Sequence, residues 1–151
     1  DAGLSRGLGD VYKRQYLGGG FGHFFVYAPN KFKYPINRYS MEVKRQLSVL
    51  DNRLEENEFI SGSTYSIADM AIWPWYGRLA LGRQYGEKAG KFLNVSEYTN
   101  VIRWATQLDQ REAVKRGEKV NRTSGDPSGQ LRERHSKEDF DLYTQDKISQ
   151  S

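Results

Sequence analysis

Arg38 is the residue of this sequence best suited to hold an anionic ligand. It stands in Ile36-Asn37-Arg38-Tyr39, near the start of a periodic apolar segment and off the face that the apolar residues form. A guanidinium group fits a carboxylate because two parallel N–H groups can bond its two oxygens. The alternative is an exposed ion pair with Glu42, which a helix would bring beside Arg38 at the i+4 position. The residues alone favour this ion pair over an anion site.

The other residues that could perform chemistry lack the partners they would need. The sequence has no cysteine, which excludes a disulfide framework, a thiolate nucleophile and a cysteine-based zinc site. His23 and His135 stand without further ligands at metal-binding spacing. Ser66 and Asp69 have no histidine at usable spacing, so they do not form a catalytic triad. We therefore expect no metal site and no catalytic residue, and any redox chemistry must borrow a thiol.

The composition is typical of a globular domain. The 151 residues are 37% hydrophobic with a net charge of +4, and the basic residues are scattered among acidic ones. No apolar run approaches the roughly 20 residues that span a bilayer, and no secretory signal core is found at the N-terminus. We expect one cytoplasmic domain with neither a nucleic-acid nor a membrane partner.

The pattern changes twice along the chain, which indicates three segments. Residues 1–15 lack helical or strand periodicity, so we expect a non-native leader of translated sequencing adapter, the alternative being a disordered native leader. Residues 16–120 hold the body, in which Gly18–Gly22 is typical of a loop. Residues 121–151 form an extended polar tail that either anchors its few large apolar groups on the body or is disordered.

Apolar periodicity predicts an all-α body. From Ile36, apolar residues recur at three- and four-residue steps with charges between them, which indicates an amphipathic helix of about five turns that ends at Glu55–Glu58. Pro35 fits at its start, where a missing N–H costs little. Another helix is expected from about Ser96, with Trp104 at the flank of its apolar face. No strand alternation persists between residues 36 and 116.

The start of a central helix is marked by a capping box. Ser66 is placed to accept a hydrogen bond from the amide of Asp69, whose carboxylate reaches back to the amide of Ser66. Tyr65 and Met70 flank the box as a hydrophobic staple. This local network accounts for both polar residues without any catalytic role.

The same helix should bend at Pro74, which cannot donate to the carbonyl of Met70. Trp73, Trp75 and Tyr76 surround the proline. They either line an apolar pocket for an electrophilic substrate or belong to the core, and the core is favoured because aromatic residues on a central helix are usually buried.

Three stretches carry a resemblance to a known family. Phe59–Trp75, FISGSTYSIADMAIWPW, resembles the capped helix in the C-terminal domain of glutathione transferases. Two further stretches resemble one group within that superfamily, the bacterial disulfide-bond oxidoreductases of the nu class. These stretches are GGGFGHFFVYAPNKFKYPINRYSMEVKRQLSVLD and VKRGEKVNRTSG. The resemblance extends from about Tyr16 to about Lys147.

This resemblance implies a two-domain protein whose thioredoxin-like N-terminal domain is missing here, so that the chain is the all-α C-terminal bundle with its polar tail. It implies glutathione as co-substrate and homodimerisation. It also implies that Arg38, in an I-x-R-Y motif, binds a glutathione carboxylate, which reverses the preference stated above.

The implied activity of the whole protein is a glutathione-dependent disulfide reductase or peroxidase with some transferase activity. The fragment alone is expected to be inactive. The alternative is a non-catalytic interaction module, because the same helical domain also serves as a docking platform in other proteins.

Overall fold

The computed structural model describes residues 14–120 and residue 126. Within this part the fold is helical and has no named strand, which confirms the all-α class; Phe59 and Gly62 form an isolated bridge. Internal contacts divide the chain into two units, Asp1–Leu108 and Asp109–Ser151. None of the described helices combines the length and apolar character of a membrane span. The elements are η1 (Arg14–Tyr27), α2 (Lys33–Glu55), α3 (Ile67–Ile72), η2 (Trp73–Gly77), α4 (Arg78–Ala80), α5 (Gly86–Leu93), η3 (Val95–Glu97), α6 (Thr99–Asp109) and α7 (Glu112–Gly117).

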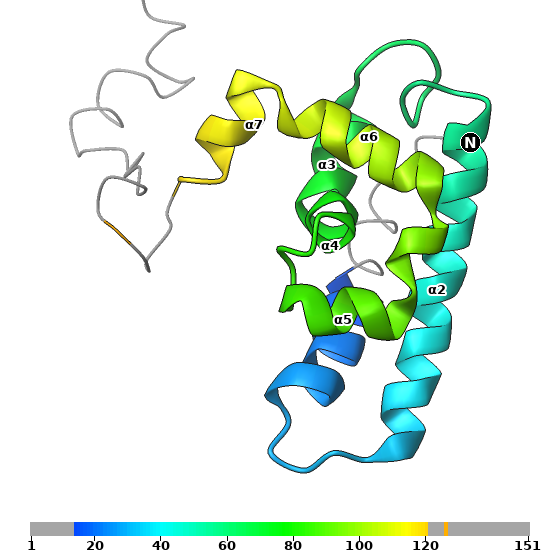
Figure 1. Ribbon diagram of the computed structural model, residues 1–151, viewed down its shortest axis with the longest axis vertical. Helices are drawn as coiled ribbons and strands as arrows, with labels where there is room; N and C mark the ends of the chain where they lie inside the picture. The colour runs from blue at the N-terminus through cyan, green and yellow to red at the C-terminus, as the bar shows by residue number, and fades with distance from the viewer. Residues whose placement is uncertain (1–13, 121–125, 127–151) are drawn as a thin grey trace, which may run out of the picture. The chain divides into compact units, whose positions relative to one another are not determined.

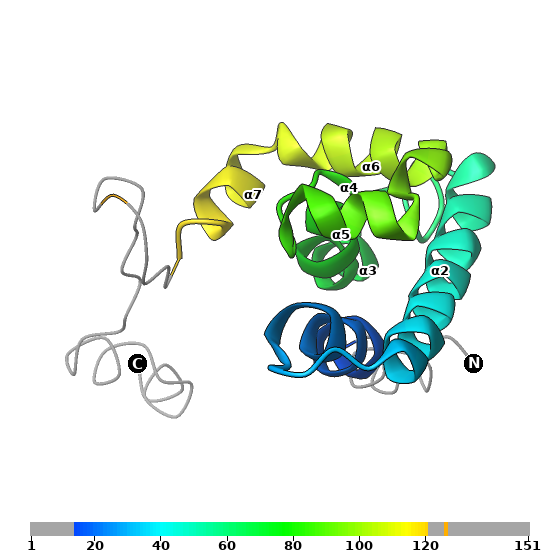
Figure 2. The ribbon, with the colours of Figure 1, turned by 60° about the horizontal axis from the view of Figure 1, so that its bottom comes forward.

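Helix α2 is the spine of the first unit. It runs along one side of the unit, with η1 beside its N-terminal half and α6 beside its C-terminal half (Figures 1 and 2). The helix begins at Lys33, three residues before the predicted start, and ends at Glu55 as predicted. Pro35 lies in its first turn, where the backbone N–H has no partner within the helix. Its buried face consists of Ser40, Val43, Leu47, Leu50 and Leu54.

The prediction of a loop at Gly18–Gly22 is wrong, because these residues lie inside the π-type helix η1. Glycine disfavours a helix when local propensity alone is considered. Here tertiary packing decides, since Leu17 and Phe21 are fully buried on one side of η1. The ring of Phe21 stacks on that of Phe25 with 4.8 Å between the centroids. The apolar side chains therefore hold the glycine-rich stretch in a helix.

The glycines of η1 allow aromatic rings to approach the backbone closely. A Cβ atom on Gly20 would lie 2.2 Å from Cδ1 of Tyr39, and one on Gly22 would lie 2.4 Å from the hydroxyl oxygen of Tyr85. Neither distance is compatible with a side chain unless the ring moves. The sequence therefore uses glycine here for close contact with rings on other elements.

Replacing Gly20 by alanine should lower the free energy of unfolding by about 1 to 3 kcal/mol, because the new methyl group overpacks against the ring of Tyr39. The matched control is Gly90→Ala in α5, where a Cβ atom meets nothing within 4 Å. This control should be neutral or stabilising, by up to about 1 kcal/mol, because alanine favours a helix. Urea unfolding of both variants measures the difference. Equal stability of the two would contradict the close packing of Gly20.

Ser66 and Asp69 form a capping box at the start of α3. The Asp69 carboxylate accepts the backbone amide of Ser66 at 2.9 Å, and the Ser66 hydroxyl oxygen accepts the amide of Ala68 at 3.3 Å. The other carboxylate oxygen accepts the amide of Ile60 at 3.0 Å and the indole N–H of Trp104 at 2.9 Å. Asp69 is fully buried, so it joins the start of α3 to the preceding loop and to α6.

The helix changes its winding next to Pro74, which has no N–H to donate. The α-helical turns of α3 end at Ile72 and continue as the π-type turn η2, which is followed by α4. Of the two predicted staple residues, Met70 is 55% exposed, whereas Tyr65 packs edge-on against Phe59 with 6.0 Å between the ring centroids.

Helices α2 and α6 each use a side chain to bond an unpaired backbone group at one end of the other helix. The Asp51 carboxylate on α2 accepts the amide of Val101 at 2.9 Å, at the start of α6. In return, Arg103 on α6 donates to the carbonyl of Leu54 at 2.8 Å, at the end of α2. Both groups would otherwise lack a helical partner. The buried side chains of α6 are Val101, Trp104, Ala105 and Leu108; Trp104, predicted at the flank, is fully buried.

The second unit contains the short helix α7, in which Lys115 pairs with Glu112 at 2.9 Å. The predicted tail, residues 121–151, lies outside the described residues except for Asp126, and so do residues 1–13 of the predicted leader. Arg14 and Gln15, at the end of that leader, form the start of η1.

Candidate functional site

Arg38 lies in the second turn of α2, because the helix starts earlier than the sequence suggests. Its side chain is 53% exposed, and its Nη1 atom contacts the carboxylate of Glu42 at 3.4 Å. The ion pair that the residues alone favoured is therefore present. Pairs of this spacing on exposed helix surfaces contribute about 0.3 to 0.5 kcal/mol, less than a ligand carboxylate held at two points.

Glu42 is shared between two arginines. Arg45 binds one of its oxygens through Nε, at 2.8 Å, and through Nη2, while Arg38 contacts the other oxygen. The Glu42 side chain is only 13% exposed, in contrast to 61% for Arg45. The hydrogen bond from Arg45, assisted by Arg38, lowers the pKa of the Glu42 carboxyl even though partial burial opposes this. The site therefore holds two cations around one stable carboxylate.

A buried tyrosine completes this arrangement. The Tyr76 hydroxyl donates to the side-chain oxygen of Gln46, the residue after Arg45 on α2. Tyr76 is 2% exposed, and burial raises the pKa of its hydroxyl, with a further upward contribution from Glu42 and a downward one from Arg45. The hydroxyl therefore stays protonated at neutral pH and acts as a donor. We call Arg38, Glu42, Arg45, Gln46 and Tyr76 the α2 polar cluster.

Aromatic rings from η1 lie beside the first turns of α2. Tyr39, the neighbour of Arg38 in sequence, stacks on Phe24 with 5.5 Å between the ring centroids and contacts the ring of Tyr16 at 6.4 Å. These contacts fix the backbone of α2 at the point where Arg38 leaves it. An exposed guanidinium on a rigid helix next to rings is suited to holding the anionic end of a small ligand.

The remaining residues considered for chemistry have structural places. His23 is exposed and lies edge-on to Phe24, with 4.9 Å between the ring centroids, while His135 lies outside the described residues. Within residues 14–120 there is no group of three side chains that could hold a metal ion. Trp73 is 5% exposed and its indole donates to the carbonyl of Ala105 at 3.0 Å, so it belongs to the core, as favoured.

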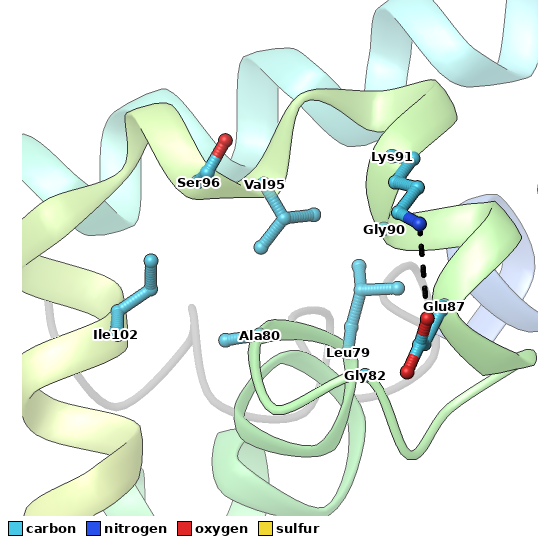
Figure 3. A pocket seen from close by; sticks show the side chains of 9 residues that line it. All are labelled: Leu79, Ala80, Gly82, Glu87, Gly90, Lys91, Val95, Ser96 and Ile102. Atoms are coloured by element: carbon cyan, nitrogen blue, oxygen red, sulfur yellow. Dashed lines mark ion pairs between the residues drawn. The ribbon is translucent and has the colours of Figure 1, made fainter.

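A second candidate is an open cavity of about 250 Å³ in the first unit (Figure 3). Its apolar lining includes Leu79 from α4, Val95 from η3 and Ile102 from α6, whose side chains face the hollow (Figure 3). An ion pair between Glu87 and Lys91 on α5 lies at one side, with 3.7 Å between the charged atoms and both side chains more than 80% exposed. No residue of the α2 polar cluster lines this cavity.

The sequence predicts Arg38 and its partner Glu42 at this site, but it does not indicate Arg45 or Gln46 and places Tyr76 only in a pocket or the core. Arg45 and Gln46 follow Glu42 by three and four residues, and this spacing would have placed them on the same face of the helix. The hydrogen bond from Tyr76 to Gln46 joins residues 30 positions apart, so no local pattern in the sequence indicates it.

Comparison with known sequences identifies similar proteins. Residues 35–106 match the family described as glutathione S-transferase, C-terminal domain. The chain is 53% identical over 132 residues to the disulfide-bond oxidoreductase YghU of Escherichia coli. The aligned residues are 87% of this chain and 45% of that protein. It is 52% identical over 106 residues to a GST-like protein of Streptococcus mutans, and the aligned residues are 70% of this chain and 40% of that protein. The chain thus spans less than half the length of these relatives.

Solved structures with the same helical arrangement contain glutathione. The glutathione transferase YghU from Streptococcus pneumoniae, complexed with glutathione, matches with a TM-score of 0.70 and 53% identity over 73% of this chain and 42% of that one. A glutathione transferase from Burkholderia graminis with two glutathione molecules bound per subunit matches with a TM-score of 0.66 and 35% identity, over 76% and 48%. One from Pseudomonas putida with glutathione disulfide bound matches with a TM-score of 0.61 and 32% identity, over 74% and 49%.

Proposed function

Because residues 35–106 form a glutathione S-transferase C-terminal domain, we propose that this chain is the helical half of a glutathione-dependent disulfide-bond reductase. The observation that carries the proposal is 53% identity to a disulfide-bond oxidoreductase over most of the chain. This chain has no cysteine, so it brings no thiol of its own to a glutathione site. The catalytic groups lie in the thioredoxin-like half of the full-length protein.

In this proposal Arg38 holds one carboxylate of glutathione or glutathione disulfide. Its side chain is half exposed, and a single long contact to Glu42 leaves most of its N–H groups available within the described part of the chain. A guanidinium and a carboxylate bonded at two points contribute about 1.5 to 3 kcal/mol, which exceeds the value of the existing surface pair. The ligand can therefore bind the other N–H groups of Arg38 while the contact to Glu42 remains.

The finer features belong to the same proposal. The full-length enzyme works as a cytoplasmic homodimer, reduces disulfides or peroxides, and has some transferase activity. The second candidate function is a non-catalytic interaction module, which is favoured because the ion pair with Glu42 accounts for Arg38 without a ligand. The genomic sequence upstream of Tyr16 separates the two, because the enzyme requires a thioredoxin-like β-α-β domain there.

The direct test is Arg38→Ala in the full-length protein that contains this chain. Binding of glutathione disulfide should weaken by about 1.5 to 3 kcal/mol, at least about tenfold, because a carboxylate loses its two-point contact. Arg38→Lys should recover part of this loss and be more sensitive to salt, since an ammonium keeps only the charge. Titration calorimetry measures the affinity of the wild type and of both variants for glutathione disulfide.

The matched control is Lys88→Ala, which removes one exposed cation from α5. Its affinity for glutathione disulfide should equal that of the wild type. If Arg38→Ala also binds like the wild type, then Arg38 is a surface residue and the proposed ligand contact is absent.

A further inference from the structure

We propose that Glu42 is a positioning residue for Arg38, which it holds in the orientation that receives the glutathione carboxylate, and that Arg45 in turn holds Glu42. This inference rests on the proposed function, because it concerns the same carboxylate site. It assigns roles to two residues of the α2 polar cluster that do not themselves touch the ligand.

The two arginines bind Glu42 unequally. Arg45 places two donors, Nε and Nη2, on one oxygen of the carboxylate, whereas Arg38 contacts the other oxygen with one donor at 3.4 Å. Two donors on one acceptor fix the carboxylate better than one distant donor does. Arg45 therefore acts as the clamp on Glu42. Arg38 is guided by Glu42 but is not saturated by it.

The burial of Glu42 supports a role beyond a surface ion pair. Its side chain is 13% exposed, while the exposed pair Glu87 and Lys91 on α5, also four residues apart, has 84% and 81% exposure. A shielded carboxylate has fewer orientations than one in open solvent, so it can restrict its partner. The backbone below it is also fixed, because Tyr76 binds Gln46 one turn further along α2.

The arrangement should favour an anionic ligand despite the negative charge of Glu42. Two guanidinium groups around one carboxylate leave a net charge of +1, so the attraction for a ligand carboxylate survives. Ordering Arg38 before the ligand arrives removes part of the rotamer entropy that binding would otherwise cost. The two effects of Glu42 have opposite signs, and the proposal commits to orientation as the larger one.

The test is a double-mutant cycle in the full-length protein, with glutathione disulfide as the probe. Glu42→Ala should weaken binding by about twofold, because Arg38 loses a contact of this strength as its guide. In the Arg38→Ala background the same change should leave affinity unchanged, since nothing remains to be positioned. Glu42→Gln, which keeps an oxygen acceptor, should recover at least half of the loss. Glu87→Ala, the matched control, should bind as the wild type does.

Each other outcome overturns the proposal in a recognisable way. If Glu42→Ala and Glu42→Gln both bind tighter than the wild type, Glu42 is only a competing charge. If Glu42→Ala weakens binding equally in the presence and absence of Arg38, it acts through another group. If Arg38→Ala alone has no effect, the proposed carboxylate contact fails and the positioning role fails with it; if Arg38→Ala weakens binding but Glu42→Ala does not, only the positioning role fails.

Discussion

Replacing Asp69 by alanine is expected to lower the free energy of unfolding by at least about 3 kcal/mol. The fully buried carboxylate accepts the amides of Ile60 and Ser66 and the indole N–H of Trp104. Hydrogen bonds to a charged group contribute about 1.5 to 3 kcal/mol each, and removal of the acceptor leaves these donors without it in the interior. Urea unfolding of the 151-residue chain measures the change.

Ser66→Ala is the matched control for the Asp69 prediction, because it removes only the hydroxyl side of the capping box. Its cost should stay near the usual value of a lost N-cap, about 0.5 to 2 kcal/mol. Neither change should alter the affinity of the full-length protein for glutathione, since neither residue belongs to the α2 polar cluster. Equal unfolding midpoints for Asp69→Ala and Ser66→Ala would contradict the wider role of Asp69.

The difference between these two residues marks what the sequence could predict. The capping box depends on residues three apart, so Ser66 and Asp69 were recognisable from their spacing. The bond from Trp104 to Asp69 spans 35 residues and has no local pattern. Periodicity placed Trp104 at the edge of the apolar face of its helix. The side chain is fully buried in the structure, where the carboxylate of Asp69 accepts its indole N–H.

The helices of the body were predictable for a similar reason. The apolar steps of α2 and α6 recur along the chain and require no knowledge of partners, so both helices were found with small errors at their ends. The helix η1 was missed because glycine propensity indicates a loop at Gly18–Gly22. The opposing factor, close contact of Gly20 with Tyr39 and Gly22 with Tyr85, exists only in the folded chain.

The candidate site shows the same limit. The sequence places Arg38 and Glu42 four residues apart and thereby predicts their ion pair, which the structure contains. The residues alone favour that pair over a ligand and the family resemblance reverses the preference, but neither includes the burial of Glu42 or its bonds to Arg45. The partly buried Glu42, held by two donors of Arg45, turns an ordinary helix pair into the arrangement on which the positioning proposal depends.

Truncating Trp104 to alanine should destabilise the chain by about 3 to 5 kcal/mol, because the largest fully buried side chain of the core leaves a cavity. Trp104→Phe should cost less, since the ring is largely kept and mainly the donor to Asp69 is lost. Urea unfolding of both variants gives the two values, and similar costs for phenylalanine and alanine would show that the hydrogen bond, not the volume, dominates.

The double variant Asp69→Ala with Trp104→Phe tests whether the two residues act through one bond. If they do, its cost should be smaller than the sum of the single costs by about 0.5 to 3 kcal/mol, because the hydrogen bond between them can be lost only once. Gly20→Ala combined with Trp104→Phe is the control. Gly20 contacts Tyr39 and not the Asp69 network, so these costs should add. Strict additivity in both pairs would mean that the Trp104 indole and the Asp69 carboxylate stabilise the fold independently, against the 2.9 Å contact between them.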